Sequence, residues 1–132
     1  MEDSRVEFLN ISKLLPTEEH IKRKADELHA KIESEGFWTH PILVLEREYV
    51  VLDGHHRCAA AALLGLTVVP SLLVSSTSPR LKLECWRDGE AVTIEEVVSR
   101  GISGDLFPPK TTKFSLLGEA PKLMVSLREL AR

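Results

Sequence analysis

Five consecutive residues, Asp53-Gly54-His55-His56-Arg57, place a carboxylate, two imidazoles and a guanidinium around one glycine. An apolar segment, residues 49–52, precedes them, and a run of small and apolar residues, 58–64, follows and ends at Gly65. This pattern predicts a strand, a glycine turn and a helix, and the first N–H groups of such a helix have no partner within it. Backbone donors beside a guanidinium suit phosphate oxygens, so the segment predicts an anion site.

Each member of this segment has a candidate role. Gly54 would let a phosphate approach the backbone closely, and Arg57 offers a planar fork of donors. Asp53 could hold a magnesium ion or orient a hydroxyl group. The plainer alternative is that Asp53 caps the helix and that the histidines are surface residues. A zinc site is disfavoured, because adjacent helical side chains point about 100° apart and no further His or Cys lies at ligand spacing.

Two other polar segments carry candidate chemistry. Glu18 and Glu19 stand in the expected first turn of a helix, where the helix dipole favours acids on a solvated surface. The functional alternative is that one of them acts as a general base. Lys110, Thr111 and Thr112 follow two prolines, and an ammonium group with two hydroxyls could clamp a phosphate or a carboxylate. The sequence contains neither a P-loop nor the protein-kinase signatures.

Aromatic residues near glycine form a further candidate. Phe37 and Trp38 follow Gly36 in an expected loop, where aromatic side chains either line a ligand pocket or cover the core. Trp86 has the same two interpretations, and a core position is favoured for it.

Composition narrows the class of protein. A length of 132 residues, with 43% hydrophobic and 28% charged residues, suits one globular domain with a single core. The formal charge of −3 argues against a nucleic-acid coat, because duplex binders carry a basic excess. No signal peptide and no membrane-spanning apolar run are present. Cys58 and Cys85 are too few for a disulfide framework, so we expect a cytoplasmic protein with reduced thiols.

Hydrophobic periodicity predicts strands and helices that alternate along the chain. The expected strands lie within residues 5–15, 42–45, 49–52, 68–74 and 81–86, the second and third as a hairpin. The expected helices start at Thr17 as N-cap, near His55, after Thr93 with Glu96 in a capping box, and over 127–130. Residues 101–109 are expected to be irregular. The fold class predicted is α+β: a mixed sheet with flanking helices in one domain over residues 1–132.

The run Val51 to Arg57, followed by the alanine-rich helix, resembles the ParB/sulfiredoxin-like fold. Within that fold the sequence is most similar to the free serine kinases, which phosphorylate L-serine itself. Three further segments carry the resemblance in the same order. They are residues 16–19, 36–41 and 104–113, which resemble the segment of the catalytic glutamate, an aromatic loop and a C-terminal clamp, and residues 127–130 resemble the family's ending.

This resemblance implies a reaction and its cofactors. The donor would be ATP or ADP with Mg²⁺, and Glu18 would take the proton of the serine hydroxyl. Gly54, His55, His56 and Arg57 would bind the phosphates, and Asp53, His55 and His56 would take part in catalysis. Phe37, Trp38, Lys110, Thr111 and Thr112 would hold L-serine. Neither a membrane nor a nucleic acid is an expected partner.

The sequence also departs from the families that it resembles. Gly101 to Asp105 bridges the point at which longer serine kinases carry a large insertion, and Thr17 stands where a histidine can precede the glutamate. His55 occupies the cysteine position of the sulfiredoxin motif, so cysteine-based reduction of sulfinic acid is not expected. The alternatives are a ParB-like regulator that binds nucleotide or DNA without turnover, and a nuclease of the same fold. A regulator would need a basic face and a helix-turn-helix, and a nuclease would need a carboxylate cluster; the sequence indicates none of these.

Overall fold

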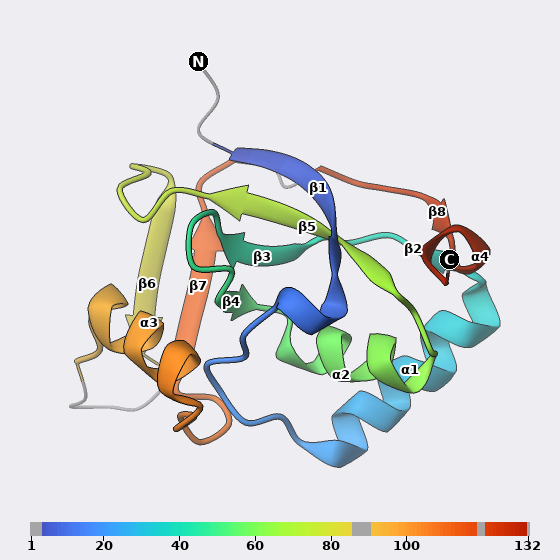
Figure 1. Ribbon diagram of the computed structural model, residues 1–132, viewed down its shortest axis with the longest axis horizontal. Coiled ribbons are helices and arrows are strands. Elements are labelled where there is room, and N and C mark those ends of the chain that lie inside the picture. The colour runs from blue at the N-terminus through green and yellow to red at the C-terminus, as the bar shows by residue number, and fades with distance from the viewer. Residues whose placement is uncertain (1–3, 86–90, 119–120, 132) are drawn as a thin grey trace.

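A four-stranded mixed sheet forms the centre of the computed structural model, which describes residues 4–85, 91–118 and 121–131 (Figure 1). Its strands are β1 (Ser4–Asn10), β3 (Ile42–Leu45), β4 (Val51–Asp53) and β5 (Val68–Val74). The spatial order is β1-β5-β3-β4. β1 pairs with β5 and β3 with β4 in antiparallel fashion, whereas β3 and β5 are parallel. The predicted mixed sheet and the predicted hairpin of β3 and β4 are therefore confirmed.

Helices and two short strand pairs surround this sheet. The helices are α1 (Lys22–Glu35), α2 (His55–Leu63), α3 (Ile94–Ser103), α4 (Leu127–Leu130) and the 3-10 turn η1 (Ile11–Lys13). The strand pairs are β2 (Phe37–Trp38) with β8 (Val125–Ser126), and β6 (Leu81–Cys85) with β7 (Thr112–Leu116). Helices α1 and α2 lie together along one side of the sheet, and α3 lies beside the β6–β7 pair at the other end (Figure 1).

Strand β3 is buried on both of its faces, which explains why its sequence is apolar throughout. Ile42 and Val44 point into the core on the side of α1 and α2. Leu43 and Leu45 point into a second core with Val97 of α3. Successive residues of a strand face opposite sides of a sheet, so a strand covered on both faces needs a continuous apolar run. None of the helices in the described ranges is long and apolar enough to cross a membrane.

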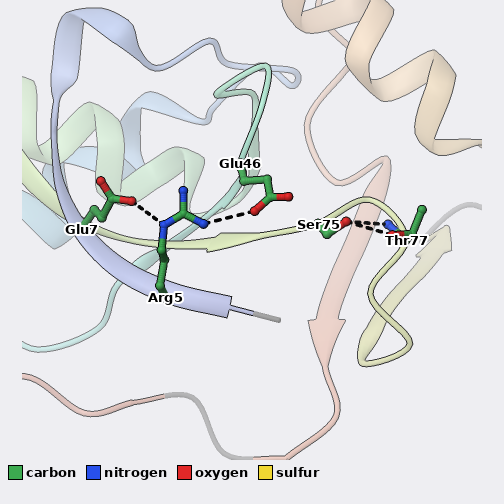
Figure 2. Close-up of polar contacts among 5 residues, drawn as sticks. All are labelled: Arg5, Glu7, Glu46, Ser75 and Thr77. Atoms are coloured by element: carbon green, nitrogen blue, oxygen red, sulfur yellow. Dashed lines mark hydrogen bonds and ion pairs between the residues drawn. The ribbon is translucent and has the colours of Figure 1, made fainter. Parts of the chain in front are cut away.

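One arginine connects the edge strand β1 to the β3–β4 turn. The Arg5 guanidinium donates to Glu7 at 2.6 Å and to Glu46 at 3.1 Å, and nearby the hydroxyls of Ser75 and Thr77 lie 2.9 Å apart (Figure 2). Water reaches these side chains and screens their charges, so the two ion pairs contribute little to stability. These contacts orient side chains at the surface and are not a main source of the stability of the fold.

The prediction that a helix starts at Thr17 is wrong. Thr17 is fully buried, its hydroxyl donates to the Val51 carbonyl at 2.8 Å, and α1 begins only at Lys22. The segment before α1 is extended, because its backbone bonds Phe107: Phe107 N–H donates to Thr17 and Glu19 N–H donates to Phe107. These long-range backbone bonds take the place of the helical turn that the local sequence favours.

Three other local predictions need correction. Phe37 and Trp38 form the short strand β2 and not a loop, since they pair with β8. Helix α3 runs through Gly101 to Ser103, so the irregular segment begins only at Gly104, which adopts φ +80°. Residues 112–116 form β7, which had not been expected. The Thr93 cap, the strand at 81–85 and the final helical turn are confirmed; Trp86 lies outside the described residues.

Candidate active site

The glycine turn joins β4 to α2 as the sequence predicts. Gly54 has φ +106°, and a Cβ at this position would lie 3.3 Å from Cγ1 of Ile42, so both its conformation and its surroundings favour glycine. Gly54 is the N-cap of α2 and no side chain caps this helix, so Asp53 does not serve as its cap. The amides at the start of α2 are therefore left for another acceptor.

The Glu18 carboxylate is held by the backbone of the 110–112 segment. Oε1 accepts from Thr111 N at 3.0 Å, Thr112 N at 2.9 Å and Thr112 Oγ1 at 3.2 Å, and Oε2 accepts from Lys110 N at 3.2 Å. Lys110 has φ +58°, a conformation in which successive N–H groups converge on one anion. The two segments are more than ninety positions apart in the sequence, and this contact fixes them against each other.

Glu18 and the glycine turn open into the same cleft, which has a volume of about 310 Å³. The residues that line it are Glu18, Lys24, Leu28, Leu52, Asp53, Gly54, His55, His56, Arg57, Lys110 and Thr112. The cleft thus brings together most of the candidate residues. Glu19 is exposed and does not line it.

Thr111 joins the site through its backbone alone. Its amide donates to Glu18, but its hydroxyl donates to the Pro108 carbonyl at 2.7 Å. The side chain is buried and faces a different cavity, which Arg100 and Phe107 also line. The hydroxyl that reaches Glu18 is that of Thr112.

Lys24 is a member of the cleft that the sequence does not point to. It lies in the first turn of α1, four residues before Leu28, so the two side chains share a helix face. Lys22 and Arg23 precede it, and the three residues together look like an ordinary solvated face. Leu28 lies at the margin of the apolar stripe of α1, and the four-residue spacing of Lys24 to Leu28 is the one sequence signal that could have identified Lys24 as a cleft residue.

Three cations around the cleft form no close ion pair with a carboxylate of the described residues. Lys24, Arg57 and Lys110 make no ion pair within 4 Å among the described residues, and both Glu18 oxygens already accept from the 110–112 segment. The neighbouring Lys110 ammonium lowers the pKa of Lys24. Cations that repel one another in this way favour a shared anion, such as a phosphate group.

Asp53 is the carboxylate that could hold a metal ion. It faces the cleft and is exposed there, yet the walls of the cleft desolvate it and raise the pKa of its carboxyl, while Arg57 and the Gly54 amide act in the opposite direction. Across residues 4–85, 91–118 and 121–131 no group of three His, Cys, Asp or Glu side chains could enclose a metal. A single carboxylate fits Mg²⁺ that takes its remaining ligands from phosphates and water.

The two adjacent histidines of α2 both face the Glu18 segment. Nε2 of His55 accepts from the Thr17 amide at 3.1 Å, and Nε2 of His56 accepts from the Ile21 amide at 3.0 Å. Burial lowers the pKa of His55 to about 4 and also lowers the pKa of His56. The rings are therefore neutral near pH 7, and the positive charge of the cleft comes from Lys24, Arg57 and Lys110.

The predicted aromatic residues lie apart from this cleft. Phe37 and Trp38 line a smaller cavity of about 140 Å³, which adjoins the cleft through Leu28 and Arg57. Trp38 is 1% exposed and its indole N–H donates to the His40 carbonyl at 2.6 Å, so its polar atom is already engaged. Phe37, in contrast, is exposed.

A third cavity, of about 300 Å³, lies on the other side of Glu18 and is mostly apolar. Its lining residues are Ile11, Leu14, Pro16, Glu18, His20, Val51, His55, Cys58, Ala59 and Leu106. Burial raises the pKa of Cys58 to about 12, which keeps the sulfur protonated as a thiol.

Comparison with known proteins settles the family. The model of the ParB N-terminal domain matches residues 1–85, which is more than half of the chain. The chain belongs to the ParB N-terminal domain family. This match contains Glu18 and the glycine turn, whereas the 110–112 segment lies beyond it.

Two curated relatives of this ParB-family chain are named as serine kinases. An ATP-dependent L-serine kinase of Staphylothermus marinus is 35% identical over 103 residues, which are 72% of this chain and 41% of the relative. The ADP-dependent L-serine kinase SerK of Thermococcus kodakarensis is 27% identical over 97 residues, which are 70% of this chain and 40% of the relative. The chain thus spans about two fifths of the length of these relatives.

A solved structure shares the fold of the ParB-family chain over nearly its whole length. A free serine kinase in complex with AMP superposes with a TM-score of 0.86 at 17% identity, over 95% of this chain and 93% of that one. At this level of identity the similarity concerns the fold, and it confirms the mixed α/β architecture.

Proposed function

We propose that this protein is a nucleotide-dependent kinase of free L-serine, with O-phospho-L-serine as its product. The observation that carries the proposal is the shared cleft. In it, a carboxylate from before α1 faces the amides of the α2 start and three cations that form no ion pair with any described residue. The names of the curated relatives supply the substrate class. A kinase needs these elements together: an anion site for the phosphates and a base for the attacking hydroxyl.

The phosphates of ATP or ADP would lie at the glycine turn. The first amides of α2 point toward this position and favour negative charge, and Gly54 leaves room for close approach. Arg57 and Lys110 would neutralise the charge that develops on the transferred group. Asp53 would hold Mg²⁺, which offsets phosphate charge when it is bound.

Glu18 would act as the general base through Oε2. Oε1 already accepts three hydrogen bonds, but Oε2 accepts a single one, from Lys110 N. Because Oε2 accepts the fewer hydrogen bonds, it is the oxygen with room to accept the proton of a serine hydroxyl. The hydroxyl oxygen then attacks the terminal phosphorus, the bond from that phosphorus to the nucleotide breaks, and the nucleotide leaves with the bonding electrons. Lys110 and the Thr112 hydroxyl would bind the acceptor.

The test is direct product detection. We expect the purified chain, incubated with Mg²⁺, L-serine and either ATP or ADP, to form phosphoserine that mass spectrometry detects, and the donor with the higher turnover identifies the physiological class. D-serine serves as a control acceptor. Nucleotide binding without any phosphoserine would contradict the proposal and favour the ParB-like regulator, for which a salt-dependent DNA gel shift is the companion measurement.

A further inference from the structure

The histidine pair of α2 makes an unusual set of contacts. Both imidazoles accept a hydrogen bond from the backbone of one segment, His55 from Thr17 and His56 from Ile21. Glu18 lies between these two attachment points. The segment carries no helix of its own, because α1 begins only at Lys22.

The backbone donors determine which nitrogen of each imidazole ring carries the proton. A backbone N–H can only donate, so each Nε2 must present its lone pair, and in a neutral ring the proton then resides on Nδ1. At His55 the Thr17 hydroxyl also lies 3.3 Å from Nε2, but that hydroxyl donates to Val51 O at 2.8 Å. The acceptor position of each ring is therefore used within the protein.

The surroundings of the rings keep them uncharged. His55 is desolvated and lies near His56 and His20. Burial is the largest cause of the lowered pKa of His56; the nearby Lys24, His20 and Lys110 also oppose its protonation, while Glu18 favours it. The His20 ring meets His56 edge-on, with centroids 6.4 Å apart and planes at 87°. Cations therefore outnumber anions around His56, which disfavours an imidazolium beside the cleft.

We infer that His55 and His56 are positioning residues that hold the Thr17–Ile21 segment against the start of α2 and thereby set Glu18 opposite the anion site. We call these two contacts the histidine latch. The latch acts together with the 110–112 backbone: that segment fixes the Glu18 carboxylate, and the latch fixes the main chain on both sides of it. The catalytic consequence of the latch depends on the proposed kinase function, but its structural part does not.

The unmodified protein gives the first test. In the ¹⁵N-labelled full chain at pH 7, long-range ¹H–¹⁵N correlation spectra distinguish the two nitrogens of each ring. The latch requires neutral rings with the proton on Nδ1 at both His55 and His56, which is the minor tautomer of free histidine. A proton on Nε2 of either ring, or a doubly protonated ring, would overturn the latch at that position.

A pair of variants gives the second test, with His29→Ala as control, because His29 belongs to α1 but does not line the cleft. In His56→Ala the Ile21 amide loses its acceptor, and we expect it to exchange with solvent roughly fivefold faster. The carboxamide oxygen of His56→Gln restores an acceptor and should restore slow exchange. If His56→Ala does not fold, His56→Gln and the tautomer measurement still decide the structural question.

Kinetics then separate positioning from direct contact. We expect kcat for phosphoserine formation to fall by about 10- to 100-fold in His56→Ala, with the KM values for nucleotide and serine nearly unchanged, and to recover largely in His56→Gln. A rise of the nucleotide KM in both variants with kcat preserved would overturn the inference, since it would place the ring on the phosphates. If the wild-type chain forms no phosphoserine, the proposed function fails, and the exchange and tautomer data alone decide the latch.

Discussion

At the scale of single residues, the side chains that carry positive charge in the cleft differ from those that hold its backbone in place. Lys24, Arg57 and Lys110 supply positive charge, whereas His55 and His56 are neutral and accept backbone hydrogen bonds. The sequence segment 53–57 predicts an anion site at the glycine turn, and its residues line the cleft, but residue types alone could not show which of these groups are charged. The answer depends on burial and on neighbours from other segments, which the local sequence does not contain.

Lys24 gives the first prediction at this scale. In Lys24→Gln, the loss of a cation that faces the cleft should weaken ADP binding by about 5- to 20-fold, and the effect should shrink at high salt. Lys22→Gln is the matched control, because Lys22 is exposed on the same helix and pairs with Asp26 at 2.8 Å. Isothermal titration calorimetry measures both. Equal losses in the two variants would show that Lys24 has no special role in the cleft.

His55 gives a prediction on pH. Its pKa in the folded protein, about 4, is below the usual 6.5, so between these values the unfolded chain binds a proton that the folded protein does not. The free energy of unfolding should therefore fall as the pH decreases, by about 1–2 kcal/mol between pH 7 and pH 5. Urea unfolding of wild type and His55→Gln at both pH values isolates this contribution. An equal pH dependence in the variant would contradict it.

At the scale of secondary-structure elements, contacts between distant segments determine the conformation of those segments that local sequence patterns predict wrongly. The sheet strands and α2 were predictable, because their apolar runs and the glycine turn leave little choice of conformation. The conformation of the segment before α1 was not predictable from the local sequence. Thr17 has the residue type of an N-cap, but its hydroxyl donates to the Val51 carbonyl and its own carbonyl accepts from the Phe107 amide. Gly101 lies within helix α3, and packing against distant residues explains why a glycine stands there. A Cβ at this position would lie 2.5 Å from Val50 Cγ1 and 3.1 Å from Thr17 Cγ2.

Gly101 gives the prediction at this scale. Gly101→Ala should push α3 away from Val50 and the buried Thr17, and we expect it to lower the free energy of unfolding by about 1–3 kcal/mol in spite of the better helix propensity of alanine. Ser99→Ala, at an exposed position of the same helix, is the control and should be nearly neutral. Thermal and urea unfolding measure the change. A stabilised Gly101→Ala protein would contradict the close packing described here.

At the scale of the whole molecule, the site exists because three distant segments converge. These segments are residues 16–21 before α1, residues 53–57 from the end of β4 to the start of α2, and residues 110–112 at the start of β7. They meet through the hydrogen bonds of Glu18, His55 and His56. The sequence suggested that these segments belong together through its resemblance to serine kinases. It could not show their contacts, because hydrogen bonds across more than ninety residues leave no local pattern.

The most direct measurement of the central claim compares phosphoserine turnover in Glu18→Gln and Glu19→Gln. Glu18 faces the cleft whereas Glu19 is exposed outside it. We predict a loss of about 10²- to 10⁴-fold in kcat for Glu18→Gln with nucleotide affinity nearly intact, and nearly normal turnover for Glu19→Gln. Normal turnover in Glu18→Gln, or an equal loss in both variants, would contradict the assignment of the base and with it the shared cleft as a catalytic site.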